Sequence, residues 1–465
     1  MNRIVIIGGG ISGLAAAHRV LELNPEAQVT ILEASDRLGG TIQTEHRDGF
    51  LLERGPDSFI SEKPHAIELA KRLGLESQLI QTNEEFRRSF IVRDGRLRAV
   101  PEGFQLMAPS RMWPFITSDI FSLPGKMRMA ADLFLPRKST NGTTDESLAS
   151  FVRRRLGEEA LARMAQPMVG GIYTADPETL SLRATLPRFL DMEEKHRSLI
   201  LAMLRQGRAQ KIGTSGARYS LFVSFEQGMQ VLVDALLTRI NADLRVKTRA
   251  QRLSFDRGWT ITTDKDEQIK ADAVCLAVPA YVAAALLTDT HPRLAENLRA
   301  IKYASTATIN FGYRRAAIAH PLNGFGFVVP FIEKRSLIAC TFSNVKFSGR
   351  APDGQVLLRA FAGGALQPEI FALDESEMSR RVEADLRELL GSREDPRFIE
   401  VAKWERSMPQ YEVGHLDRVD EIERLAGELP GLALAGNAYR GAGIPDCIRS
   451  GEAAADLLTN HRASA

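Results

Sequence analysis

Three glycines near the start of the chain have the spacing of a loop that binds a dinucleotide. Gly8, Gly10 and Gly13 form the pattern G-x-G-x-x-G between an apolar run, residues 4–7, and a helix-forming stretch, residues 14–21. The first glycine permits a tight turn, the second lets the backbone approach a pyrophosphate, and the third lets the helix pack on the strand. The pyrophosphate would lie at the helix N-terminus. The predicted binding residues are Gly8, Gly9, Gly10, Ile11, Ser12 and Gly13.

A carboxylate supports this interpretation. Glu33 lies 20 residues after Gly13, at the end of a predicted strand, residues 29–32. An acidic side chain at this distance holds the ribose hydroxyls of a dinucleotide and disfavours the 2′-phosphate of NADP. A glycine-rich turn without a ligand would explain neither the helix nor Glu33. The pattern therefore predicts FAD or NAD.

The composition indicates a globular protein and argues against a nucleic-acid-binding one. The 465 residues are 44% hydrophobic and 25% charged, which is typical of globular chains, and the length corresponds to about three domains. Lysine and arginine (60) almost balance aspartate and glutamate (58), so the chain lacks the strong positive charge of a nucleic-acid-binding protein. We expect no nucleic acid among its partners.

Cysteine and histidine spacing gives no sign of a metal site. The three cysteines form no C-x-x-C pair, and the eight histidines form neither H-x-x-x-H nor H-E-x-x-H. The N-terminal residues lack the pattern of a signal peptide. The longest uncharged run, residues 273–288, is shorter than the roughly 20 residues that cross a bilayer. We predict a cytoplasmic protein with no metal, no disulfide and no membrane-spanning helix.

A second glycine pair indicates which dinucleotide is bound. Arg37, Gly39 and Gly40 closely follow Glu33, and this segment resembles the R-x-G-G stretch that wraps FAD in the amine-oxidase superfamily. The resemblance implies FAD as the cofactor, although a Gly-Gly pair alone also occurs in ordinary turns. The residues that the resemblance places at FAD here are Glu33, Ala34, Arg37, Gly39, Gly40 and Thr41.

Five further segments narrow the resemblance. Residues 53–59 (ERGPDSF), 170–177 (GGIYTADP) and 436–448 (GNAYRGAGIPDCI), with residues 225–234 and 324–330, are similar in order and spacing to the oxygen-dependent porphyrinogen oxidases of haem synthesis. The resemblance implies the six-electron oxidation of coproporphyrinogen III or protoporphyrinogen IX in three two-electron steps, with O2 reduced to hydrogen peroxide. The flavin would accept hydride, so no catalytic triad is needed.

The same resemblance implies further cofactor contacts. Val246 would meet the adenine through its backbone, and Trp404 would touch the cofactor, although an isolated tryptophan is often simply buried. Asp57 is the candidate catalytic residue, since it could polarise or receive a pyrrole proton; an Asx turn after Pro56 is the alternative. The other predicted contacts are Gly55, Pro56, Asp57, Ser58, Gly436, Ala442, Gly443 and Ile444.

Six residues are predicted to line a tetrapyrrole site, which must hold an apolar macrocycle while its propionates meet cations or water. Phe327 and Phe347 are candidate walls, although a phenylalanine more often packs in a core. Ser89 stands where plant members of the family carry an arginine thought to hold a propionate. This favours coproporphyrinogen III, unless Arg87 or Arg88 substitutes. The predicted residues are Ser89, Gly171, Ile172, Tyr173, Phe327 and Phe347.

The predicted fold class is α/β with α+β insertions. The resemblance implies a discontinuous, Rossmann-like FAD-binding domain of the amine-oxidase type, made of residues 1–85, 212–290 and 425–465. Residues 86–104 and 291–424 would form an antiparallel-sheet substrate domain. A helical domain would comprise residues 105–211.

Two groups of strands are predicted from alternating and β-branched runs. The first group would form a hairpin-rich sheet joined to the FAD-binding domain: residues 244–247, 251–256, 258–262 and 273–277. The second would form an antiparallel sheet over the flavin: residues 306–313, 326–330, 336–342 and 356–361. The remaining predictions are a helix at residues 376–390, a strand at 432–437 and a helix at 446–458.

Residues 86–138 combine positive charge with aromatic side chains. They include ten lysines and arginines against four aspartates and glutamates. Such a surface suits anionic lipid headgroups or a substrate that carries carboxylates. A solvated basic face around a helical core explains the pattern equally well. Peripheral contact with the inner face of the cell membrane is therefore one of two interpretations.

The expected partners are a tetrapyrrole substrate and O2, and the resemblance also suggests a homodimer and transfer of the product to a ferrochelatase. Two other functions stay open. A flavin amine oxidase or carotenoid desaturase would share the first 40 residues, but not residues 170–177 or 441–448. A non-catalytic escort protein with an FAD fold is disfavoured by Glu33 and residues 37–40.

Overall fold

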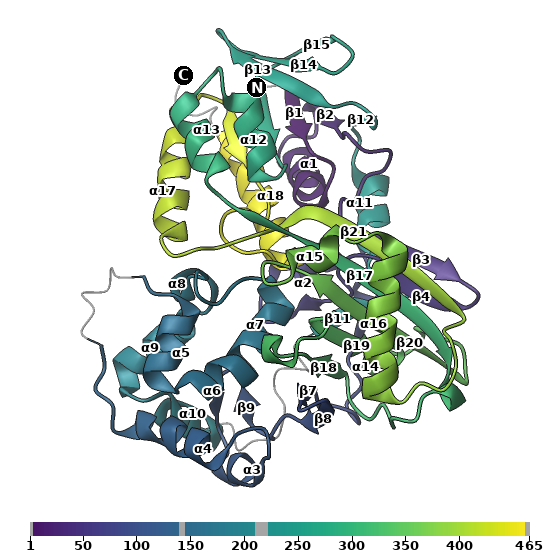
Figure 1. Ribbon diagram of the computed structural model, residues 1–465. Coiled ribbons are helices and arrows are strands. Elements are labelled where there is room, and N and C mark those ends of the chain that lie inside the picture. Colours follow the sequence, from purple (N-terminus) through teal and green to yellow (C-terminus); the bar gives the residue numbers. More distant parts are fainter. Residues whose placement is uncertain (1–2, 139–144, 210–221, 461–465) are drawn as a thin grey trace.

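The chain folds into three bodies, which Figure 1 shows as a parallel sheet between helices, a larger mixed sheet, and a group of helices. The computed structural model describes residues 3–138, 145–209 and 222–460. This combination of elements agrees with the predicted α/β class with α+β insertions.

The first body contains a five-stranded parallel sheet in the order β12-β2-β1-β16-β22. Along β1, Ile4 and Ile6 pack on one side of the sheet, and Val5 and Ile7 pack on the other. Helices α1, α2, α11 and α18 share the first core, whereas α12, α13 and α17 share the second. The bounds are β1 Arg3–Ile7, β2 Gln28–Leu32, β12 Asp243–Arg245, β16 Ala273–Leu276, β22 Leu432–Leu434, α1 Ile11–Leu23, α2 His65–Arg72, α11 Gln230–Arg239, α12 Ala280–Leu287, α13 Pro292–Arg299, α17 His415–Ala426 and α18 Ile444–Asn460.

The prediction of a hairpin-rich sheet is correct for residues 251–256 and 258–262 and wrong for residues 244–247 and 273–277. Three strands form an antiparallel sheet of their own, β13 Ala250–Phe255, β14 Trp259–Thr263 and β15 Gln268–Ala271. The strands β12 and β16 instead belong to the parallel sheet, where β16 pairs with β1 and is buried at all four positions. A short apolar run does not reveal whether its partner is a hairpin neighbour or a distant parallel strand.

The second body is a seven-stranded sheet in the order β21-β17-β20-β19-β18-β7-β8. The predicted antiparallel arrangement is confirmed for β17 to β20, but β18 pairs with β7 in parallel. Helix α16 packs on this sheet through Met378, Val382 and Leu386. The bounds are β7 Phe90–Arg93, β8 Arg96–Ala99, β17 Tyr303–Arg314, β18 Gly326–Val328, β19 Ala339–Phe342, β20 Gln355–Gly363, β21 Phe398–Pro409, α14 Ser343–Lys346, α15 Pro368–Ala372 and α16 Glu375–Leu390.

The third body is the predicted helical region, which has its own apolar core. Its elements are β9 Phe104–Gln105, β10 Ala108–Pro109, α3 Met112–Thr117, α4 Leu123–Ala130, η2 Ala131–Leu133, α5 Leu148–Arg155, α6 Glu158–Ala160, η3 Leu161–Ala165, α7 Gln166–Tyr173, α8 Leu182–Thr185, α9 Pro187–His196 and α10 Leu199–Ala209. Short strands near the cofactor loops complete the fold: β3 Thr44–Arg47, β4 Phe50–Glu53, β5 Phe59–Ile60, β6 Leu79–Gln81 and β11 Phe222–Phe225.

The predicted domain boundaries stay predictions. The boundary between residues 211 and 212 lies outside the described residues. Helices α13 and α17, which the prediction grouped with the substrate domain, pack against the parallel sheet.

Candidate cofactor site

The first glycine loop joins β1 to α1 and is shaped by very close backbone packing. A Cβ atom at Gly8 would lie 2.3 Å from the carbonyl oxygen of Ala277, and one at Gly13 would lie 1.9 Å from the carbonyl oxygen of Gly8. Gly10 differs, because a Cβ there would meet only the Cα of Gly40, at 3.9 Å. The loop is therefore packed at its two ends and open at its middle glycine, as a pyrophosphate site requires.

Glu33 lies at the end of β2, beside this loop. Its Oε2 accepts a 2.8 Å hydrogen bond from the backbone N–H of Gly9, and its Oε1 accepts one of 2.8 Å from Ser35. The half-buried carboxylate is thus held in place at the sheet edge. Val246 follows β12 at the same edge, where the carbonyl of Glu33 accepts from Thr248 N–H at 2.9 Å. Ala34, next to Glu33, is exposed. Glu33, Ala34 and Val246 together fit a ribose and an adenine.

The second glycine pair lies directly against the first loop. The N–H of Gly39 donates to the carbonyl of Gly9 at 2.8 Å, and Gly10 and Gly39 form a parallel bridge. Arg37 fastens the turn by donating to the carbonyls of Gly40 and Ile42 at 2.7 and 2.6 Å. The structure therefore brings together the two motifs that the sequence placed at one phosphate group.

Residues 53–58 begin at the end of β4, and side chains of the mixed sheet donate to the carbonyls of Arg54 and Gly55. The carbonyl of Arg54 accepts from Trp404 Nε1 at 2.9 Å and also from Thr308 Oγ1. The carbonyl of Gly55 accepts from the buried Arg359. Trp404, predicted to touch the cofactor, is thus placed behind a predicted cofactor segment; its contact with FAD stays a prediction.

Asp57 is the candidate catalytic residue and lies in a cluster of opposite charges. Its Oδ2 accepts a 2.9 Å hydrogen bond from Lys346 Nζ and lies 3.8 Å from Arg359, while Ser58 Oγ donates to Oδ1 at 2.8 Å. Burial raises the pKa of Asp57, but the attraction of Lys346 and Arg359 outweighs burial and holds this pKa well below its usual range. The carboxylate is ionised, which favours a polarising role over a proton-accepting one.

The C-terminal loop, residues 436–443, is fixed by Tyr411. The phenol oxygen of Tyr411 donates to the carbonyl of Asn437 and accepts a 3.0 Å hydrogen bond from the N–H of Gly441. Its ring stacks on His415 with centroids 4.1 Å apart. A Cβ at Gly436 would meet nothing within 4 Å, so this part of the loop is open.

The start of α18 completes the loop. Ala442 is half-buried and Gly443 exposed, and the helix begins at Ile444. The partial positive charge of a helix N-terminus suits an anionic group. The open Gly10 and Gly436, the held Glu33 and this helix end together fit a flavin dinucleotide.

The predicted substrate residues fall into two environments. Gly171, Ile172 and Tyr173 end α7, where a Cβ at Gly171 would lie 3.7 Å from Val328 of β18. Phe327 and Phe347 are instead buried, with 3% and 1% of their surface exposed, so each is also explained as a core residue.

Ser89 is half-buried just before β7. Of the two neighbouring arginines, Arg87 is ion-paired with Glu84. Arg88 is exposed and has no ion pair with any described residue. Arg88 is therefore the better placed of the two to meet a propionate.

Three residues of the site were missed by sequence reasoning. Arg359 left a signal, since a charged residue interrupts the buried strand β20. Lys346 and Tyr411 left none, because their partners lie far away in the sequence. Among the described residues, no group of three or more His, Cys, Asp or Glu is arranged to hold a metal ion, and all three cysteines are free and buried.

Similarity to known proteins extends along the whole chain. A family model for flavin-containing amine oxidoreductases matches residues 11–459. The coproporphyrinogen III oxidase of Bacillus subtilis is 36% identical over 98% of this chain and 98% of its own length. The chloroplastic protoporphyrinogen oxidase of Nicotiana tabacum is 30% identical over 98% of this chain and 85% of its own. A crystal structure from Exiguobacterium, provisionally assigned as a protoporphyrinogen oxidase, is 31% identical with a TM-score of 0.89 over 99% of both chains.

Proposed function

The chain belongs to the family of flavin-containing amine oxidoreductases, and we propose that it is an FAD-dependent oxidase that converts coproporphyrinogen III to coproporphyrin III. The observation that carries the proposal is the end-to-end similarity to the coproporphyrinogen III oxidase of Bacillus subtilis, in a chain whose two glycine loops meet at Gly10 and Gly40. Ser89, in place of the plant arginine, favours coproporphyrinogen III over protoporphyrinogen IX. The electron acceptor would be O2, reduced to hydrogen peroxide.

In this proposal the residues of the chain position FAD and the substrate, and they polarise the substrate. When bound, FAD supplies the hydride acceptor for three successive two-electron oxidations. Glu33 would hold the ribose, and the loop of Gly8 to Gly13 would hold the pyrophosphate. Asp57, kept ionised by Lys346 and Arg359, would attract a pyrrole N–H. Arg88 would meet a propionate at the edge of the macrocycle.

Anaerobic mixing tests this function. Flavin absorbance of the purified protein is followed after addition of coproporphyrinogen III and, in a parallel cuvette, of protoporphyrinogen IX. We expect faster bleaching by coproporphyrinogen III, followed by porphyrin fluorescence once air is admitted. Faster bleaching by protoporphyrinogen IX would reverse the substrate assignment, and no bleaching by either would contradict the porphyrinogen reaction.

An exposed apolar face on the helical body supports peripheral membrane contact. Trp113, Leu123, Met127 and Phe134 are 74%, 70%, 61% and 80% exposed. They lie on α3, on α4 and after η2, at the end of the molecule away from the parallel sheet (Figure 1). No helix in the described ranges is long and apolar enough to cross a membrane. An apolar face that lies on the surface of a bilayer needs no such helix.

Cations adjoin this face around a surface depression. Arg137, Lys195, Arg197 and Arg205 line the depression together with Phe134. None of these four cations forms an ion pair within the described part of the chain. Unpaired cations beside exposed apolar side chains suit a bilayer with anionic headgroups.

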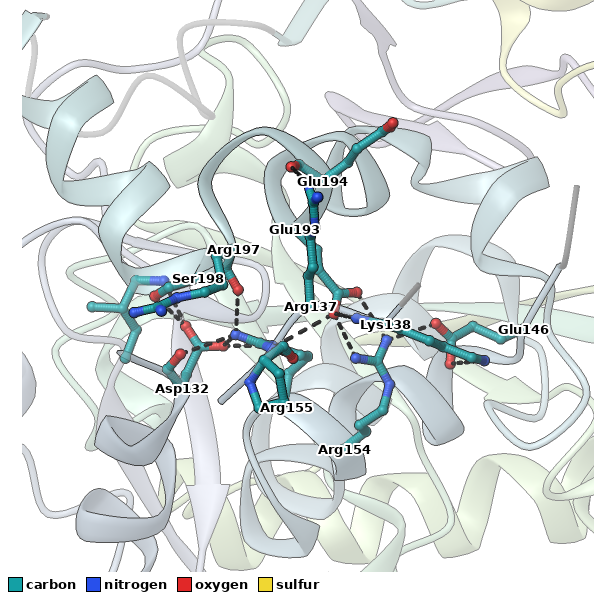
Figure 2. A network of polar contacts seen from close by, with 12 residues as sticks. Asp132, Arg137, Lys138, Glu146, Arg154, Arg155, Glu193, Glu194, Arg197 and Ser198 are labelled. Carbon is teal, nitrogen blue, oxygen red and sulfur yellow. Dashed lines mark hydrogen bonds and ion pairs between the residues drawn. The ribbon is translucent and has the colours of Figure 1, made fainter. Parts of the chain in front are cut away.

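A buried network fixes the rim of the depression. Figure 2 shows Arg155, which is fully buried, between Asp132 and the backbone of the rim. Arg155 donates to the carbonyls of Pro136 and Arg197 at 3.0 and 2.7 Å. The network therefore holds the backbone at Arg197 and next to Arg137.

Vesicle sedimentation tests the membrane contact. We expect the protein to sediment with vesicles of phosphatidylglycerol but not of phosphatidylcholine, and the double substitution Trp113→Ser, Phe134→Ser to abolish it. Leu457→Ser is the control, since Leu457 is 61% exposed and lies on α18, which packs on the parallel sheet. Equal sedimentation of the double variant would contradict this face. A cytoplasmic location stays a prediction from the sequence, and a homodimer and transfer of product to a ferrochelatase stay predictions of the resemblance.

A further inference from the structure

A small cavity lies behind the Asp57 segment, between β4 and β20. Its polar lining consists of Glu53, Asp57, Ser343, Arg350 and Arg359. It is large enough for about one water molecule. Two carboxylates and two guanidinium groups therefore face one small space.

One polar group in this space has no partner. Ser343 is 7% exposed, and its Oγ forms no hydrogen bond within the described residues. Buried hydroxyl groups are nearly always satisfied by protein or by ordered water. A water in the cavity would satisfy Ser343 and would also meet the carboxylates of Glu53 and Asp57.

Glu53 differs from Asp57 in its surroundings. Its Oε1 accepts from the N–H of Met229 at 2.7 Å and its Oε2 accepts from Thr44 Oγ1 at 2.8 Å. The charged groups that face it are Arg350, Arg359 and Asp57. Because burial outweighs the attraction of the two arginines, the pKa of Glu53 rises to about 7. Glu53 can thus change its protonation near neutral pH, whereas Asp57 stays ionised.

We propose that the cavity holds one water molecule that links Glu53 to Asp57, and that Glu53 is the proton-holding residue of the oxidase. The proposal rests on the proposed function. Each two-electron oxidation takes a hydride from a meso carbon and one proton from the macrocycle. Over the three steps, two of these protons come from pyrrole N–H groups and one comes from the fourth meso carbon. The proton passes through the water, which the ionised Asp57 polarises, to the Glu53 carboxylate, which becomes a carboxylic acid. Formation of hydrogen peroxide from O2 takes up the hydride equivalent and one proton, and Glu53 returns that proton.

The test measures the midpoint potential of the bound flavin against pH, without substrate, in the purified holoprotein. A residue that only supports the fold would not change how this potential depends on pH. We expect the slope near pH 7 to differ between the wild type and Glu53→Gln, because only the wild type carries the titrating carboxyl of Glu53. Ser343→Ala should shift the pH at which the wild-type slope changes. Glu45→Gln is the matched control, because Glu45 lies on β3 of the same hairpin and pairs with Arg54 outside the cavity.

A second measurement distinguishes loss of the proton-holding carboxyl from misfolding of the variant. Infrared difference spectra of flavin reduction should show the carbonyl band of a protonated carboxylic acid in the wild type and in Glu45→Gln, but not in Glu53→Gln. An unchanged slope and band in a Glu53→Gln variant that retains flavin would overturn the proposal. Turnover of coproporphyrinogen III is measured in parallel: a wild type that holds flavin but does not turn over refutes the proposed function instead.

Discussion

The phenol oxygen of Tyr411 lies 3.0 Å from the backbone nitrogen of Gly441 and also bonds to the carbonyl of Asn437, so one side chain closes the loop in front of α18. Tyr411→Phe leaves both backbone groups without this partner, at a cost of about 1–3 kcal/mol. We expect FAD to bind about tenfold more weakly. Equilibrium titration of the apoprotein with FAD measures this, and Tyr281→Phe, which removes a hydroxyl elsewhere, should bind FAD as the wild type does.

Gly10→Val should abolish retention of flavin. A Cβ at Gly10 enters the open middle of the loop, where only the Cα of Gly40 lies within 4 Å. The fold should therefore survive, whereas a pyrophosphate would clash with the larger side chain. Flavin absorbance of the purified variant gives the answer. Gly258→Ala is the control, since a Cβ there makes an ordinary 3.6 Å contact; a yellow Gly10→Val protein would refute the placement.

The two glycine loops could be predicted from sequence because their contacts follow from short spacings and from strand order. The pairing of Asp57 with Lys346 and Arg359 could not be predicted from sequence. Lys346 reaches Asp57 across 289 residues of sequence, so no local pattern links the two residues. Arg359 marks a buried charge within β20 but does not name its partner. The place of β16 in the parallel sheet was likewise missed, because its apolar run suits either kind of pairing.

Glu53→Gln should change how stability depends on pH. The pKa of Glu53 is about 7 in the folded chain against 4.5 in a model peptide. Between these values the unfolded chain releases the proton and the folded chain keeps it, so the free energy of unfolding falls as pH rises, by about 3 kcal/mol. Glu53→Gln should lack this decline in urea unfolding at pH 5 and 7.5. A decline equal to that of the wild type would contradict the raised pKa.

Ser89→Arg should shift substrate preference. The added guanidinium, close to the exposed Arg88, would pair with a propionate in the way that the resemblance suggests for plant enzymes. We expect kcat/KM for protoporphyrinogen IX to rise several-fold relative to coproporphyrinogen III. Ser89→Gln, which adds length without charge, is the control. The propionate assignment fails if both variants give the wild-type ratio.

Arg155→Met should strongly destabilise the helical body. Arg155 is fully buried and donates from Nε to Asp132 Oδ1 at 2.7 Å. Within the described ranges, its loss leaves a buried carboxylate with only Ser198 and the N–H of Ile200 as partners. Breaking such a buried pair costs about 3–5 kcal/mol. Arg153→Met in the same helix is the control, because Arg153 pairs with exposed glutamates and such pairs contribute at most about 1 kcal/mol. The midpoint of thermal unfolding should therefore be clearly lower for Arg155→Met than for Arg153→Met. Equal midpoints would show that the buried network does not support this body.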